Sequence, residues 1–262
     1  MKNIIMNNQK IVNCELAYTK CFSDFVENQD VIRYRDKLLA DMYDYNYTFV
    51  KTAMEDKTLY SCIEQEISQS LLDGNNFCNI VQTAPISDSL ISMFATKPEV
   101  TTYGYYSFNI ADFSKFEGDK NCSILKVDGA KMVEDALYLH LEHDGESFGR
   151  EFCAKMVYRR SEVYLSDTGV DAYVCYDNGV AIGNCDMFLN CNVAKIEDFE
   201  VLSTHQRKGY GRAILKELIG IAIENNAQTI YVTTDEDDTA KEMYLKCGFV
   251  KRGEKTQLFF KW

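Results

Sequence analysis

The chain has 262 residues, of which 46% are hydrophobic, enough to bury a core in one large or two small domains. Its formal net charge of −12 argues against general nucleic-acid binding, because that function needs a basic surface. The N-terminal run is too short and too polar for a signal peptide, and no apolar run reaches transmembrane length. We therefore expect a cytoplasmic protein that does not bind membranes. Its ten cysteines are then expected to be reduced small hydrophobes.

Residues 1–118 are predicted to form an N-terminal α/β lobe. Residues 30–75 are predicted to be mostly helical, and the helical spacing of apolar residues over 59–72 ends at Gly74. Aromatic residues crowd 43–49, where they either line a pocket that holds an amine by cation–π contact or belong to the core. A strand, a short helix and a second strand are expected at 77–81, 87–95 and 103–110.

A polar stretch around Gly118 separates this lobe from a second predicted domain, residues 119–262. The pair Asn178-Gly179 is typical of a two-residue hairpin turn, so the strands on either side of it are predicted to pair. The predicted order is β-α-α-β-β-β-α-β-α-β. These elements are a strand at 122–127, helices at 131–142 and 151–165, strands at 172–176, 180–188 and 193–201, a helix at 213–223, a strand at 228–234, a short helix that ends at Gly248, and a last strand.

Two histidines, His140 and His143, lie three residues apart at the end of one predicted helix. No cysteine, aspartate or third histidine stands at ligand spacing, and the chain has no Cys-x-x-Cys pair. We therefore expect a pair on the surface and no metal site.

The most informative stretch is 201–212, where a loop with Gly209 and Gly211 joins a predicted strand to a long amphipathic helix. The first turn of a helix offers unpaired N–H groups and the positive end of its dipole, and glycine lets a phosphate approach the backbone closely. A diphosphate is therefore the expected ligand. The spacing is not that of a dinucleotide-binding G-x-G-x-x-G motif or of a P-loop.

The loop Gln206-Arg-Lys-Gly-Tyr-Gly-Arg212 resembles the Q/R-x-x-G-x-G/A loop with which the GCN5-related N-acetyltransferases (GNATs) bind the pyrophosphate of acetyl-CoA. A later segment, 239–249, resembles the A-x-x-x-Y-x-x-x-G-F signature of the same family. The resemblance extends from about residue 120 to the C-terminus. It implies an α/β fold with a mixed, mostly antiparallel central sheet flanked by helices. The N-terminal lobe is either a degenerate GNAT-like copy that binds no coenzyme or a lobe of unrelated origin.

The resemblance also implies roles for individual residues. Tyr244 matches the tyrosine near the coenzyme sulfur and would be the general acid; the alternative is a core aromatic. Asp237 stands where the family often has asparagine, and it can accept a hydrogen bond or cap a helix but cannot donate as an amide does. The strand before the loop would present the backbone of Phe199, Glu200 and Val201 to the pantetheine arm. The loop residues expected to bind the pyrophosphate are Gln206, Arg207, Lys208, Gly209, Tyr210, Gly211 and Arg212.

Transfer of an acetyl group to an amine also requires a group that takes the proton of the amine. Glu197, Asp198 and Glu200 lie on the strand before the loop. Strand alternation puts Glu197 on the face of Val201, and Glu197 is the predicted base. A bulge in this strand would change the face and favour Asp198 or Glu200. An acidic strand edge, or deprotonation through water without a dedicated base, stays open.

The predicted function is acetyl-CoA-dependent N-acetylation of a primary amine on a small acceptor, with which the negative charge of the chain is compatible. Two alternatives are a non-catalytic acyl-CoA-binding sensor and a peptide or protein N-acetyltransferase, which needs an open groove. Residues 1–115 are expected to bind no coenzyme and to close one side of the acceptor pocket. We expect a monomer or a homodimer.

Overall fold

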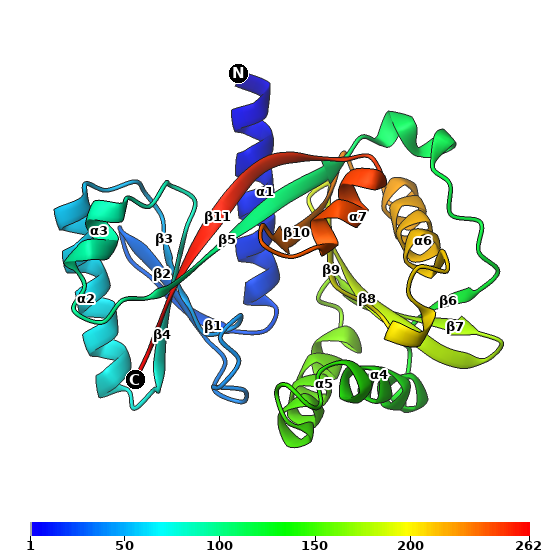
Figure 1. Ribbon diagram of the computed structural model, residues 1–262, viewed down its shortest axis with the longest axis horizontal. Helices are drawn as coiled ribbons and strands as arrows, with labels where there is room; N and C mark the ends of the chain where they lie inside the picture. Colours follow the sequence, from blue (N-terminus) through cyan, green and yellow to red (C-terminus); the bar gives the residue numbers. More distant parts are fainter. Residues whose placement is uncertain (1) are drawn as a thin grey trace. The chain divides into compact units, whose positions relative to one another are not determined.

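The computed structural model describes the backbone of residues 2–262 and the side chains from residue 8 on, and it divides into two compact units (Figure 1). Each unit combines segments that lie far apart in the sequence. The boundary predicted between residues 118 and 119 falls within the first unit and stays a prediction. The first unit comprises Met1–Cys21, Tyr106–Thr233 and Glu242–Arg252, and the second comprises Phe22–Tyr105, Thr234–Lys241 and Gly253–Trp262.

The second unit contains strands in the order β1-β2-β3-β4-β11, with helices α2 and α3. Neighbouring strands are antiparallel except for β3 and β4. Leu59 and Ile63 of α2 pack into a buried core with apolar side chains of β2, β4 and β11. The bounds are β1 Asp24–Glu27, β2 Val31–Arg35, β3 Thr48–Val50, α2 Asp56–Leu72, β4 Phe77–Gln82, α3 Asp88–Met93 and β11 Phe249–Lys261, whose first residues belong to the first unit.

The helix predicted over residues 30–75 is confirmed only for α2, because β2 and β3 are strands. Their β-branched and aromatic residues are buried in succession, and a short run of this kind does not distinguish a buried strand from a helix by periodicity. Of the aromatic stretch 43–49, Tyr45, Tyr47 and Phe49 are buried, and Tyr45 stacks on Phe22 with ring centroids 4.4 Å apart. These three residues belong to the core.

The first unit has a mostly antiparallel sheet in which β6, β7, β8 and β9 form a meander, and β10 joins β9 in parallel. Helices α4 and α5 lie on one side of β7 and β8, and α6 lies on the other (Figure 1). The bounds are α1 Lys2–Lys20, β5 Glu99–Phe108, β6 Ser123–Lys126, α4 Ala130–His143, α5 Arg150–Tyr164, β7 Val170–Asp177, β8 Val180–Asn190, β9 Val193–Val201, α6 Tyr210–Glu224, β10 Thr229–Asp235 and α7 Ala240–Lys246; β5, β10 and α7 extend across the unit limits.

This arrangement confirms the predicted fold class and every predicted element after residue 120. Asn178 and Gly179 join β7 to β8 with backbone φ angles of 49° and 81°, as the predicted hairpin turn requires. Gly248, at a φ angle of 86°, follows the last turn of α7. Among the described residues, no helix is long and apolar enough to cross a membrane.

A bulge interrupts β9 where the candidate base residues lie. Asn184 of β8 is opposite Glu200, but Asp186 is opposite Glu197, so β9 contains one residue more than β8 in this interval. Asp198 has a φ angle of 52°, and its carbonyl oxygen accepts a hydrogen bond of 3.1 Å from the Asn184 amide. The bulge shifts the alternation of side chains downstream, so the prediction that Glu197 shares the face of Val201 is wrong.

Candidate active site

The loop between β9 and α6 leaves the start of α6 open. Gly209 precedes the helix with a φ angle of 95°, a left-handed conformation that glycine adopts without strain, and no described side chain caps this end. The amide of Ala213 donates to the Gly209 carbonyl at 3.1 Å. The N–H groups of Tyr210, Gly211 and Arg212 therefore precede the first hydrogen bond of the helix and point toward a possible anion.

Position 211 is closely packed. A Cβ atom there would lie 3.3 Å from Sδ of Met243 and 3.7 Å from the ring of Phe199. The helix start thus lies directly against α7 and against the bulged strand.

The loop side chains are mostly directed to the protein itself. Gln206 donates from Nε2 to the Val201 carbonyl at 2.9 Å, and Lys208 donates from Nζ to the Thr204 carbonyl at 2.7 Å. Arg212 donates to the Lys246 carbonyl at 3.1 Å, and the hydroxyl of Tyr210 is hydrogen-bonded to Asp177. The loop therefore offers an anion its backbone N–H groups, with the exposed positive charge of Arg207 and Lys208 nearby.

The backbone of β9 has an edge available beside this loop. Its parallel pairing with β10 ends at Ile196 and Val232, so the bulged part of β9 lies beyond the β9–β10 ladder. This part includes Phe199, Glu200 and Val201, the residues predicted to contact the pantetheine arm.

Tyr244 is buried on α7, 6% exposed, next to the same strand. Its ring lies 6.3 Å from that of Phe199 and 5.7 Å from that of Phe249, measured between centroids. The first unit therefore brings together the bulged strand, the glycine loop and Tyr244. Asp237 is exposed and belongs to the second unit, and its predicted contact with the coenzyme stays a prediction. Before α7, the neighbouring Asp238 accepts a hydrogen bond of 3.2 Å from the Ala240 amide through its carboxylate.

Glu197, the predicted base, is held by a buried lysine. Its carboxylate lies 2.8 Å from Nζ of Lys195, which also donates to Glu15 of α1 at 2.6 Å. The side chain of Glu197 is 32% exposed. The strand therefore presents Glu197 as one partner of a structural ion pair, accessible from one side.

Asp198 and Glu200 face α4 and α5. Asp198 lies 2.8 Å from Arg160 of α5 and 3.3 Å from Nε2 of His140 of α4. Burial raises the pKa of Asp198, but Arg160 and His140 outweigh it and bring that pKa below its ordinary value. Burial, together with the charge of Asp198, raises the pKa of Glu200 to about 7, against the opposing effect of His140. A carboxyl group with this pKa can exchange a proton near neutral pH.

His140 is buried at 4% exposure, so the prediction that His140 and His143 form a surface pair is wrong for His140. Burial lowers its pKa, but Asp198 and Asp144 outweigh that effect and raise it to about 10. The partners Asp198 and Glu200 come from β9, which local spacing on α4 cannot reveal. One pattern in the sequence does indicate that His140 is buried. It follows the apolar residue Val133 by seven positions, and residues seven apart share a helix face.

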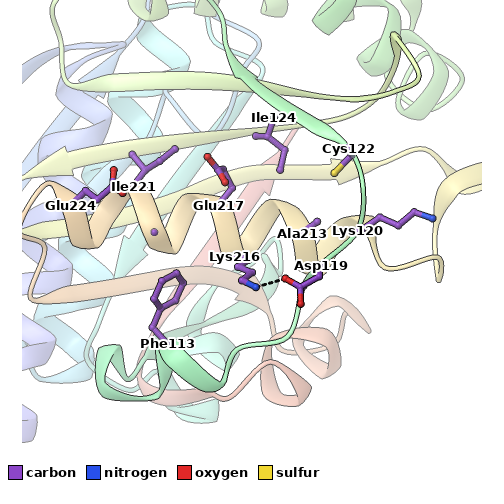
Figure 2. A pocket seen from close by; sticks show the side chains of 12 residues that line it. Phe113, Asp119, Lys120, Cys122, Ile124, Ala213, Lys216, Glu217, Ile221 and Glu224 are labelled. Atoms are coloured by element: carbon purple, nitrogen blue, oxygen red, sulfur yellow. Dashed lines mark hydrogen bonds and ion pairs between the residues drawn. The ribbon is translucent and has the colours of Figure 1, made fainter.

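A groove of about 440 Å³ lies along α6 (Figure 2). It is lined by α6 and by residues 118–124, with Phe113 at one end and an ion pair between Lys216 and Asp119. None of the predicted site residues lines this surface, which we call the reference groove.

The central segment of the chain is similar to known acetyltransferases. Residues 137–249 match the sequence profile of the Acetyltransferase (GNAT) family. Over 127 residues the chain is 29% identical to the uncharacterized N-acetyltransferase CgeE of Bacillus subtilis (strain 168). This segment covers 47% of the chain and 49% of CgeE, so the chain spans about half the length of this curated relative.

Solved structures share the fold over most of the chain. A functionally unknown conserved protein from Staphylococcus epidermidis aligns with a TM-score of 0.76 at 19% identity, over 91% of this chain and 94% of that one. A GCN5-related N-acetyltransferase from Kribbella flavida aligns with a TM-score of 0.70 at 12% identity, over 96% and 94%. A tandem GNAT protein from the clavulanic acid biosynthesis pathway aligns with a TM-score of 0.56 at 9% identity, over 82% and 75%. These likenesses show a GNAT-like fold that includes the N-terminal lobe, and residues 137–249 match the model of the GNAT acetyltransferase family.

Proposed function

We propose that the chain is an acetyl-CoA-dependent N-acetyltransferase that acts on the primary amine of a small acceptor. The uncapped start of α6, with Gly209 and Gly211 next to the bulged strand and Tyr244, carries this proposal. Such a start binds a diphosphate through backbone N–H groups, and the open edge of β9 suits the extended pantetheine arm. The net charge of −12 favours a cationic acceptor.

The reaction proposed for this site forms one bond and breaks another. The nitrogen of the neutral amine attacks the thioester carbonyl carbon, a carboxylate of β9 takes the proton of that nitrogen, and the C–S bond then breaks. A backbone N–H of β9 would stabilise the oxyanion, and Tyr244 would give its phenolic proton to the departing thiolate. Glu197 is the base predicted from the sequence, and the bulge supports Glu200 as its competitor.

We also propose a cytoplasmic location, which is supported by the cysteines. All ten are free thiols, and a reducing compartment is where such a chain is expected.

Turnover of acetyl-CoA with a panel of small primary amines tests the proposed function. Free thiol release that depends on both the amine and the chain is expected. CoA binding without turnover on any amine would favour the acyl-CoA-binding sensor, and turnover restricted to peptides would favour a peptide acetyltransferase.

A further inference from the structure

Four side chains converge at the end of α4 and on the bulged part of β9. They are His140, His143, Asp144 and Glu200, called here the histidine–carboxylate cluster. Asp144 lies 2.9 Å from Nδ1 of His143 and 3.8 Å from Nδ1 of His140. Glu200 lies 3.6 Å from Nδ1 of His143 and 3.7 Å from Nδ1 of His140. Each carboxylate thus faces both imidazoles, with one oxygen directed to each ring.

The separations are those of ligands around one small cation. A tetrahedral site with metal–ligand bonds of about 2.0–2.2 Å has neighbouring ligand atoms about 3.3–3.6 Å apart. Ligand atoms of His143, Asp144 and Glu200, one from each, lie within 4.8 Å of one another, whereas His140 faces the other oxygen of each carboxylate. Small shifts would therefore let His143, Asp144 and Glu200 surround one ion.

Two atoms of the cluster are buried without a hydrogen bond. The side chain of His140 is 5% exposed, and within the described part of the chain its Nδ1 and Oε2 of Glu200 face each other at 3.7 Å without a hydrogen-bond partner. Buried polar atoms are normally satisfied, so Glu200 retains the capacity to bind a further ligand.

A second layer of residues fixes the orientation of His140. Its other ring nitrogen, Nε2, lies 3.3 Å from Asp198, and Arg160 holds Asp198 at 2.8 Å. The ring of His140 is therefore fixed beside one oxygen of Glu200, while the other oxygen of Glu200 faces His143. Asp144 and Glu200 together can offer two negative charges to an ion.

We propose that His143, Asp144 and Glu200 bind one divalent transition-metal ion, with Zn²⁺ as the best fit to one imidazole and two carboxylates. Zn²⁺ accepts these ligands in tetrahedral geometry and matches their combined charge. A metal-bound Glu200 cannot accept a proton, so in the metal-loaded chain Glu197 or water would be the base.

The test uses the full-length chain and Zn²⁺ alone, without acetyl-CoA, so that its outcome is independent of the proposed enzymatic activity. The chain is dialysed against Zn²⁺ and then against metal-free buffer, and bound zinc is measured by mass spectrometry. We expect about one ion per wild-type chain. His143→Ala should lose this ion while it keeps the fold, because the His143 side chain is 43% exposed. His205→Ala is the matched control, since His205 is the third histidine of the chain and lies outside the cluster.

Free thiols can also bind zinc, so Co²⁺ is used to identify the ligands. Co²⁺ bound by nitrogen and oxygen gives visible absorption without the near-ultraviolet charge-transfer band of thiolate ligation, and this spectrum should disappear in His143→Ala. A folded wild-type chain that retains no metal would overturn the proposal. Equal metal in His143→Ala and His205→Ala, or a thiolate spectrum, would overturn it as well and would leave the cluster as ion pairs of protonated histidines.

Discussion

The glycine loop at the start of α6 and the histidine–carboxylate cluster lie on either side of the bulged strand β9, and they are built in opposite ways. The loop offers backbone N–H groups, and its Gln206, Lys208 and Arg212 side chains are bonded to carbonyl groups of the chain. The cluster offers side chains, and its surroundings are buried charges such as Arg160 and Asp198. Substitutions in the loop should therefore weaken CoA binding by changing the shape of the backbone site. Substitutions around the cluster should lower the stability of the fold by leaving buried charges without a partner.

The largest expected effect is on the chemical step, at Tyr244, which packs against the bulged strand. Tyr244→Phe keeps the packing against Phe199 and Phe249 but removes the proton donor. General acid catalysis is worth about 10²–10⁴-fold, and we expect a loss in this range in the single-turnover rate, with CoA affinity nearly unchanged. A wild-type single-turnover rate would make Tyr244 a packing residue.

The next effect is on stability and concerns the cluster side of β9. Arg160 is 5% exposed and lies between Asp186, at 3.5 Å, and Asp198, at 2.8 Å. Arg160→Leu leaves two buried carboxylates without their cation, which should lower the free energy of unfolding by about 3–5 kcal/mol. Chemical denaturation measures this difference. Arg150→Leu, at the exposed start of the same helix, is the control, with an expected change within about 0.5 kcal/mol. Equal values for the two variants would contradict the charge argument.

The loop should respond to added volume and negative charge. Gly211→Glu places a side chain against Met243 and a carboxylate where the diphosphate is proposed to bind. We expect CoA to bind about 100-fold more weakly by calorimetry, which corresponds to about 2.8 kcal/mol. The wild-type chain should bind one CoA, because the N-terminal lobe is expected to bind none.

Gly220→Glu is the matched control for this variant, because it adds the same side chain to the same helix at the reference groove (Figure 2). A Cβ atom at Gly220 meets only the ring of Phe113, at an ordinary 3.5 Å. Its CoA affinity should equal that of the wild type. An unchanged affinity in folded Gly211→Glu would remove the central claim about the loop.

The two regions differ in how far the sequence reveals them. The loop is one contiguous stretch, and its glycine spacing, the helix after it and Tyr244 were all predictable from local pattern. The cluster joins α4 to β9, more than fifty residues away, and depends on a bulge that only the pairing with β8 makes visible. For the same reason the prediction of helix is wrong for β2 and β3. Their residues are buried because of the strands with which they pair, and their own periodicity does not indicate this.

The smallest of these effects, a loss of about tenfold or more in kcat/KM, is expected for the base. Its measurement distinguishes Glu200 from Glu197 as the residue that accepts the proton of the amine. The pKa of Glu200 is raised to about 7, chiefly by burial and also by Asp198. The unprotonated carboxylate is the active form of a base. When kcat/KM is calculated for the neutral form of the amine, it should therefore rise with pH up to about 7 and then level off. Glu200→Gln should remove this rise and lower kcat/KM at pH 8 by at least about tenfold.

Glu197→Gln is the matched control for Glu200→Gln, because it removes the other candidate carboxylate of the same strand while the bulge remains. Glu197 is paired with Lys195, so its loss should leave the rise near pH 7 in place. Both variants are assayed with a chelator, so that a metal ion cannot occupy Glu200. If the rise disappears in Glu197→Gln and persists in Glu200→Gln, the base is the residue that strand alternation predicted, in spite of the bulge. If both variants retain it, the amine loses its proton through water, and the cluster side of β9 has no part in the chemical step.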